Sequence, residues 1–226
     1  MREKKIVIHQ PDFIPYLGFF HRLLQCDLFI ILDHVQLLAR GWHHRDLIKG
    51  PDGKHWLTVP IQRSVKRPPI NEAVIDYSTN WVEKHLKTIT NFYGKAPFFT
   101  RLYPELEEVY HRKYRLLVDL NMAMLNIFID LFLISVETTL SSSFDIRSRK
   151  SALILELVQA VKGTHYLSGV GARDYLDPSI FENNHITLLW QDFHHPVYPQ
   201  LHGDFIAHLS CLDFAMNCGP ALRDYF

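Results

Sequence analysis

The sequence predicts an α/β fold whose core is a parallel sheet. A short apolar run, KIVIH, occupies residues 5–9, and a second, LFIIL, occupies residues 28–32. The segment between them has helical character from Leu17 to Gln25. Strand, helix and strand within so short a stretch form a βαβ unit, and such units pair their strands in parallel through a right-handed crossover.

The turn between the first strand and its helix is set by two prolines. Pro11 and Pro15 in HQPDFIP disfavour a helix start before Tyr16, because proline restricts both itself and its preceding residue. Beyond the βαβ unit, residues 38–53 are polar and predict a loop. The next segment, HWLTVPI at 55–61, predicts a third strand, and RSVKRPP after it predicts a flexible, basic surface loop.

The middle of the chain predicts helices. Asn80 is a candidate N-cap for a helix over 81–93, which Gly94 ends. Pro104 is suited to open a second helix reaching about Leu117. An amphipathic helix is expected within 116–136.

Strands and helices alternate again after this middle. The simplest architecture is one domain, residues 1–226, with a helical insertion at about 81–140. The remaining expected elements are a strand at 141–146, a helix at 151–162, a strand in THYLSG, a strand at 186–193 and a helix at 209–219.

Composition excludes several functions. Lys and Arg number 24, as do Asp and Glu, so the net charge of zero lacks the basic excess that nucleic-acid binding requires. The three cysteines form no C-x-x-C pair, which favours free thiols and a reducing compartment. The N-terminal apolar run is too short for a signal peptide, and polar residues interrupt 116–136, so no membrane span and a cytoplasmic location are expected.

Polar residues follow the first two predicted strands. His9 ends the first strand and is followed by Gln10; Asp33 follows the second, with Gln36 shortly after. Parallel neighbours present their carboxyl ends at one edge, where α/β sheets bind ligands. We therefore expect a site containing His9 and Asp33. The alternative is that these side chains only cap loops.

Three further segments supply candidate ligand contacts. In GWHHRDLIK, Arg45 and Lys49 suit phosphate or carboxylate and Trp42 suits a ring, unless the segment is only a solvated loop. In SGVGARDY, the backbone can cradle a phosphate, or merely form a tight turn, and the segment contains neither G-x-G-x-x-G nor G-K-[ST]. Its candidate residues are Ser168, Gly169, Gly171, Arg173 and Asp174.

The segment WQDFHHPVY provides a third candidate catalytic histidine. His194 and His195 are adjacent, which disfavours shared metal coordination on a strand, and no H-E-x-x-H occurs. His195 is better suited to act as a general base, with Tyr198 beside the ligand. No metal or organic cofactor is predicted.

Six segments together resemble the WbqC-like protein family. They are HQPDFIPYLGFFHRL (9–23), LDHVQ (32–36), GWHHRDLIK (41–49), GTHYLSGVGARDYLD (163–177), WQDFHHPVYPQ (190–200) and LSCLDFAMNCGP (209–220). The family commonly has Leu-Asp-Asp-Val-Gln at the second motif, so His34 is a departure. The resemblance implies a bacterial role in O-antigen, surface-polysaccharide or natural-product biosynthesis.

A more distant similarity links the first βαβ unit to nucleotidyltransferases and class I aminoacyl-tRNA synthetases, which are Rossmann-like. Those proteins have H-x-G-H where this chain has Tyr16-Leu17-Gly18-Phe19, so both histidines are missing. The resemblance implies nucleotide or pantetheine binding near Tyr16 and Gly18 without that adenylyl-transfer chemistry.

Two functions fit these features. The first is a transferase that moves an acyl, aminoacyl or glycosyl group onto a sugar-linked acceptor, with a nucleotide sugar or a CoA or carrier-protein thioester as the small-molecule substrate. The second is a non-catalytic module that binds a nucleotide sugar or a carrier protein. In either case His9, Asp33 and His195 are expected to line one cleft, with Arg45 and residues 168–174 at its rim.

Overall fold

The computed structural model describes residues 3–64 and 67–226. The chain forms two compact units, each assembled from separated stretches of sequence. Unit 1 comprises Met1–Gln10, Phe20–His34 and Ser135–His194. Unit 2 comprises Pro11–Phe19, Val35–Ile134 and His195–Phe226.

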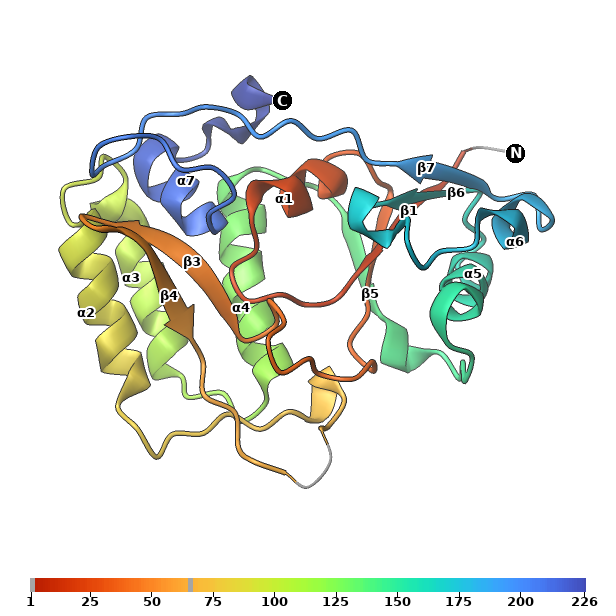
Figure 1. Ribbon diagram of the computed structural model, residues 1–226, viewed down its shortest axis with the longest axis horizontal. Helices are drawn as coiled ribbons and strands as arrows, with labels where there is room; N and C mark the ends of the chain where they lie inside the picture. The colour runs from red at the N-terminus through yellow and green to blue at the C-terminus, as the bar shows by residue number, and fades with distance from the viewer. Residues whose placement is uncertain (1–2, 65–66) are drawn as a thin grey trace. The chain divides into compact units, whose positions relative to one another are not determined.

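Unit 1 is built on a five-stranded parallel sheet with the order β5-β2-β1-β6-β7 (Figure 1). β1 and β2 are parallel neighbours, with Ile6 opposite Leu28, as the sequence predicts. Their apolar residues are buried on both faces, which is typical of strands inside a parallel sheet. The strands are β1 (Lys5–His9), β2 (Leu28–Ile31), β5 (Glu137–Leu140), β6 (His165–Ser168) and β7 (Thr187–Trp190).

Helices connect and cover these strands. The predicted helix after the first strand is α1 (Leu17–Leu23), and the predicted helix near 151–162 is α5 (Lys150–Ala160). The chain leaves α5 at Gly163, where a Cβ atom would clash with Ile6 of β1 and Val158 of α5. The helix end therefore packs directly on the central strand. A short helix, α6 (Pro178–Glu182), packs beside β7.

The predicted strand at 141–146 is wrong. Residues Ser141–Ser143 form a short 3₁₀-helix, η2, and the strand β5 lies just before it. β5 is an edge strand that pairs only with β2, and its residues ETTL are largely exposed. Such a strand needs no apolar run, so its sequence carries little signal.

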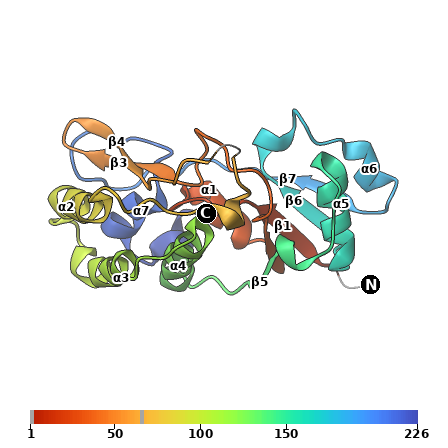
Figure 2. The same ribbon diagram turned by 90° about the horizontal axis from the view of Figure 1, so that it is seen from below.

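Unit 2 combines helices with a two-stranded antiparallel hairpin. The helices α2, α3 and α4 lie side by side, and α7 packs against α3, α4 and β3 (Figures 1 and 2). Its elements are β3 (Arg45–Gly50), β4 (Gly53–Thr58), η1 (Ile70–Glu72), α2 (Trp81–Tyr93), α3 (Phe99–His111), α4 (Leu117–Leu131), α7 (Cys211–Cys218) and η4 (Ala221–Tyr225).

Several predictions for this unit need correction. Part of the predicted loop at 38–53 is the strand β3, which buries Asp46 and Lys49 along with Ile48 and so lacks an apolar signature. α3 begins at Phe99, so Pro104 lies inside it. Asn80 occupies the N-cap position of α2, but its side chain makes no capping hydrogen bond. Part of the predicted basic loop at 63–69, residues 65–66, lies outside the described residues.

A buried histidine ties the hairpin to the helices. His85 of α2 accepts a hydrogen bond at Nε2 from the Thr58 backbone N–H, 3.0 Å away, and its Nδ1 lies 3.2 Å from the Tyr110 hydroxyl. Trp81 packs edge-on against the same ring. Burial lowers the pKa of His85 from 6.5 to about 4, so the ring is neutral at pH 7.

This histidine predicts a loss of stability in mild acid. The unfolded chain protonates His85 near pH 6.5 and the folded chain only near 4, so the free energy of unfolding falls as pH drops through that window. Between pH 7.5 and 5 the contribution of His85 should fall by about 2 kcal/mol.

Urea unfolding at the two pH values measures this effect. The difference between them should shrink by that amount in a His85→Gln variant, whose amide does not titrate. An equal pH dependence in the two proteins would contradict the assignment. His111→Gln, at the exposed end of α3, serves as the matched control.

Candidate functional site

The order of the parallel sheet defines where unit 1 is suited to bind a ligand. From β1 the chain adds β2 and β5 on one side and β6 and β7 on the other. The order therefore reverses between β1 and β6. In open α/β sheets the crevice outside the carboxyl ends of the strands at such a reversal is the usual ligand site.

His9 lies at this point. β1 and β6 pair through Lys5 opposite His165 and Ile6 opposite Tyr166, and His9 is the last residue of β1. His9 Nδ1 is 2.9 Å from the carbonyl oxygen of Gln10. Because a carbonyl only accepts, Nδ1 carries the hydrogen, and the lone pair of the neutral ring lies on Nε2. The ring is thus in the tautomer that accepts a proton at Nε2.

A buried arginine lies at the end of the neighbouring strand. Arg22, in the last turn of α1, is 4% exposed, and a Cβ atom at Gly169 would be only 3.2 Å from its Nη1. Burial raises the pKa of Tyr175, and the Arg22 charge counteracts this rise. Gly169 therefore allows the backbone and a guanidinium to meet at the carboxyl end of β6. The sequence analysis missed Arg22, although it lies within one of the quoted motifs.

Gln191 continues the same edge after β7. It is buried, and its Nε2 is 3.0 Å from Nδ1 of His21, which precedes Arg22 in α1. Burial lowers the pKa of His21, and the adjacent charge of Arg22 lowers it further. His21 therefore favours its neutral form, and Arg22 supplies the positive charge beside it.

Asp33 lies at the same carboxyl edge, on the other side of β1, just after β2. Its Oδ1 accepts hydrogen bonds of 2.9 Å from the Ser141 hydroxyl and the Ser142 backbone N–H, and its Oδ2 accepts one of 2.7 Å from the Ser142 hydroxyl. Nδ1 of His34 lies 2.6 Å from the same Ser141 hydroxyl. Asp33 thus caps η2 and joins the ends of β2 and β5. This is the structural alternative raised by the sequence; a catalytic role stays a prediction.

The predicted phosphate turn contains a short 3₁₀-helix, η3 (Val170–Ala172). Ser168 is buried at the end of β6, whereas a Cβ atom at Gly171 would meet nothing within 4 Å. A side chain would therefore crowd the Arg22 guanidinium at position 169 but would meet open space at 171. The guanidinium of Arg173 lies 5.3 Å from the centre of the Trp190 ring, which holds it near the end of β7. Asp174 is exposed.

The other predicted site residues belong to unit 2. His195 lies in an aromatic cluster, 4.8 Å from the His208 ring centre and 5.8 Å from that of Phe205. Its Nδ1 donates to the Pro196 carbonyl oxygen over 2.9 Å, so its proton acceptor is Nε2, as in His9. Burial lowers the pKa of His195, which favours the neutral form. A common cleft with His9 and Asp33 stays a prediction, because those residues belong to unit 1.

Lys49 and Tyr198 form hydrogen bonds within unit 2. The buried Lys49 ammonium donates to Gln200 Oε1 at 3.1 Å and to the carbonyl oxygens of Gly203 and Asp204 at 3.2 and 2.5 Å. The Tyr198 hydroxyl donates over 2.9 Å to the buried carboxylate of α7 at position 213. Lys49 therefore holds the 200–204 loop, a role that the sequence analysis did not assign to it.

Asp213 completes this network from α7. Its Oδ1 accepts a 2.8 Å hydrogen bond from the Tyr93 hydroxyl, which in turn accepts one of 2.9 Å from the Lys49 backbone N–H. Burial raises the pKa of Asp213, while the two tyrosine hydroxyls and the Lys49 charge oppose this rise. The carboxylate thus links α2, β3 and the segment containing Tyr198.

The remaining predicted residues of unit 2 have simpler surroundings. A Cβ atom at Gly18 would overlap the Tyr16 ring, so that ring already occupies the space over this glycine. Gln36 pairs with Pro69 in an isolated bridge. Arg45 and Trp42 lie on or beside the hairpin, where the guanidinium of Arg45 is 4.3 Å from the centre of the Trp56 ring.

Unit 2 also contains a buried Asp–His pair that was not predicted from the sequence. His43 Nδ1 lies 2.9 Å from Asp12 Oδ1, across 31 residues of sequence. Asn121 of α4 donates to the carbonyl oxygens of Pro11 and His43 at 2.6 and 2.7 Å, which fixes both loops. Within residues 3–64 and 67–226, His43 Nε2 has no hydrogen-bond partner. Both residues lie in the quoted motifs, but only folding shows that they pair.

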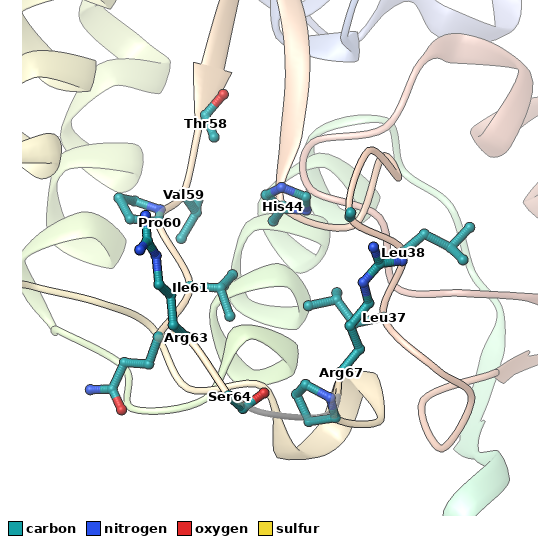
Figure 3. Close-up of a pocket in the computed structure, with 13 residues that line it drawn as sticks. Leu37, Leu38, His44, Thr58, Val59, Pro60, Ile61, Arg63, Ser64 and Arg67 are labelled. Carbon is teal, nitrogen blue, oxygen red and sulfur yellow. The ribbon is translucent and has the colours of Figure 1, made fainter.

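Unit 2 also contains a cavity of about 450 Å³ below the end of β4. Arg67 extends along the wall formed by Leu37 and Leu38, and Arg63 along the opposite wall beside Pro60 (Figure 3). The described lining residues include no carboxylate.

Comparison with known proteins identifies the family of the chain. The model of the WbqC-like protein family matches residues 10–225. The chain belongs to this family. An uncharacterized protein of Mycobacterium tuberculosis (strain ATCC 25618 / H37Rv) is 32% identical over 225 residues, which cover 98% of this chain and 97% of that protein. No solved structure matches. Among the described residues of this family member, no helix is long and apolar enough to cross a membrane.

The Lys49 network predicts a large effect on stability. Lys49→Met should lower the free energy of unfolding by on the order of 3 kcal/mol, because several buried oxygens lose their donor. Urea denaturation measures this. Lys54, the exposed cross-strand partner of Lys49, is the matched control, and Lys54→Met should change stability by less than about 0.5 kcal/mol. Equal effects of the two substitutions would refute the role of the buried ammonium.

Proposed function

We propose that the protein is a transferase of surface-polysaccharide or related natural-product biosynthesis. It moves an acyl or aminoacyl group, or a glycosyl group, from an activated donor bearing phosphate onto a sugar-linked acceptor. The observation that supports this proposal is the position of His9 at the end of β1 and of the Arg22 guanidinium beside Gly169, just after β6, because the sheet order reverses between these two strands. The biosynthetic setting rests on the family resemblance.

The two side chains supply complementary chemistry. The Arg22 guanidinium pairs with the phosphate of a nucleotide-linked, CoA or carrier-bound donor, which fixes the donor at the carboxyl edge. His9 Nε2 accepts the proton of the attacking amine or hydroxyl. For acyl transfer, the nucleophile bonds to the carbonyl carbon, the thiolate or phosphate leaves, and the proton held by His9 passes to the leaving group.

Asp33 and His195 keep their proposed catalytic roles within this scheme. The Asp33 carboxylate is fixed by Ser141 and Ser142 at the end of β2, the strand beside β1. His195 is held in the same tautomer as His9, and burial keeps it neutral. Its chemistry makes it the alternative base if His9 proves to bind the substrate instead.

Ligand binding and turnover test the proposal separately. Thermal unfolding with UDP- and dTDP-sugars, acyl-CoA and aminoacyl carrier protein should show stabilisation by a phosphate-bearing donor. Mass spectrometry of mixtures with amino-sugar acceptors should then show transfer. Stabilisation without transfer by any donor would favour a binding module instead.

The His9→Asn variant distinguishes a role of His9 as a base from a purely structural role. The amide can replace the Nδ1–H donor but has no basic nitrogen. We expect donor binding to persist and the rate to fall by about 10²–10⁴-fold. Arg22→Lys should instead weaken donor binding by about tenfold, because lysine lacks the planar fork. His165→Asn, at the amino end of β6, is the control. Full turnover by a folded His9→Asn variant would exclude His9 as the base.

A further inference from the structure

The hairpin of unit 2 exposes two tryptophans side by side. Trp42 is 48% and Trp56 is 47% exposed, and their ring centres are 5.5 Å apart. Arg45 lies over the Trp56 ring and also donates to the Arg40 carbonyl oxygen at 3.1 Å. The cation therefore fixes one ring, while much of the indole surface stays open to solvent. Exposed indoles of this kind are suited to stack on a planar or apolar ring.

This aromatic surface leads into the cavity described above. Arg45 and Thr58 are cross-strand partners, and Thr58 lies two residues beyond Trp56 on the same face of β4. Thr58 and His44 both line the cavity, and His44 is two residues beyond Trp42. Two residues of strand span about 7 Å, so the rings and the cavity mouth lie within the length of one small ligand.

The cavity has the charge of an anion site. Arg63 and Arg67 extend along opposite walls, and apolar residues such as Leu37, Val59 and Ile61 form much of the remainder (Figure 3). Two guanidinium groups facing one space without a carboxylate in the described lining favour a phosphate between them. The volume of about 450 Å³ is in the range of small-ligand sites.

We propose that this hairpin and cavity form a second ligand site, which binds a ring-bearing phosphate ester. The ring stacks on Trp42 and Trp56, and the phosphate lies between Arg63 and Arg67. The shared chemistry is that of a nucleoside phosphate or a sugar phosphate. The inference does not depend on the transferase proposal, because it uses only unit 2 and concerns binding alone.

Isothermal titration of the full chain tests the site. The probes are UMP, glucose 1-phosphate, uridine, glucose and inorganic phosphate. UMP or glucose 1-phosphate should bind at least about tenfold more tightly than either the matching unphosphorylated compound or phosphate alone. Preference for UMP identifies the nucleoside source, and preference for glucose 1-phosphate the sugar source. No binding of either ester at millimolar concentration, or equal binding of inorganic phosphate, would overturn the proposal.

Exposed variants then locate the binding. Trp42→Ala should weaken it about tenfold or more through lost stacking, and Trp42→Phe should restore most of the affinity. The Arg63→Ser/Arg67→Ser double variant should weaken it about tenfold or more. Arg101→Ser, on the exposed side of α3, controls for net charge. If Trp42→Ala and the double arginine variant both bind normally, the site is elsewhere.

Discussion

Unit 1 depends on the parallel pairing of β1 with both β2 and β6. A parallel pair cannot be closed by a tight turn, so each pairing requires a crossover that returns the chain to the same edge. One crossover contains α1 and places Arg22 in its last turn; the other is far longer and ends at α5 and Gly163. The reversal of strand order beside β1 follows from these two returns. The position of the candidate site is therefore a consequence of how the central strand is paired.

Unit 2 meets a different constraint, since much of its chain is irregular. Backbone groups in such segments need partners, and buried side chains supply them. The Lys49 ammonium holds the 200–204 loop, the Asp213 carboxylate holds two tyrosines, and the Asn121 amide holds the loops containing Pro11 and His43. The Lys49 ammonium and the Asp213 carboxylate are costly to bury unless they are hydrogen-bonded. Polar residues thus define the fold here as much as apolar ones do.

This contrast explains what the sequence could predict. Strands 5–9 and 28–32 were predictable because central parallel strands are continuous apolar runs, and their pairing followed from the short connection. β3 was missed because its buried residues include Asp46 and Lys49, and β5 because an exposed edge strand needs no apolar pattern. The candidate residues at the ends of β1 and β2 were proposed from their position after two apolar strands. Arg22 was missed because only its proximity to Gly169 gives it a role.

The histidine tautomers show how much of such a site can be encoded locally. His9 and His195 each donate from Nδ1 to the carbonyl oxygen of the following residue, and each lies just before or within two residues of a proline. For His9 that carbonyl belongs to Gln10, whose backbone is restricted by the following Pro11; for His195 it belongs to Pro196 itself, whose φ is fixed by its ring. The proton-accepting nitrogen is then set by three residues of chain. The proposed phosphate site has no such local code, because Arg22 and Gly169 come from separate elements. A short histidine–proline motif can therefore indicate a base from sequence, whereas the partner that the base serves becomes visible only in the fold.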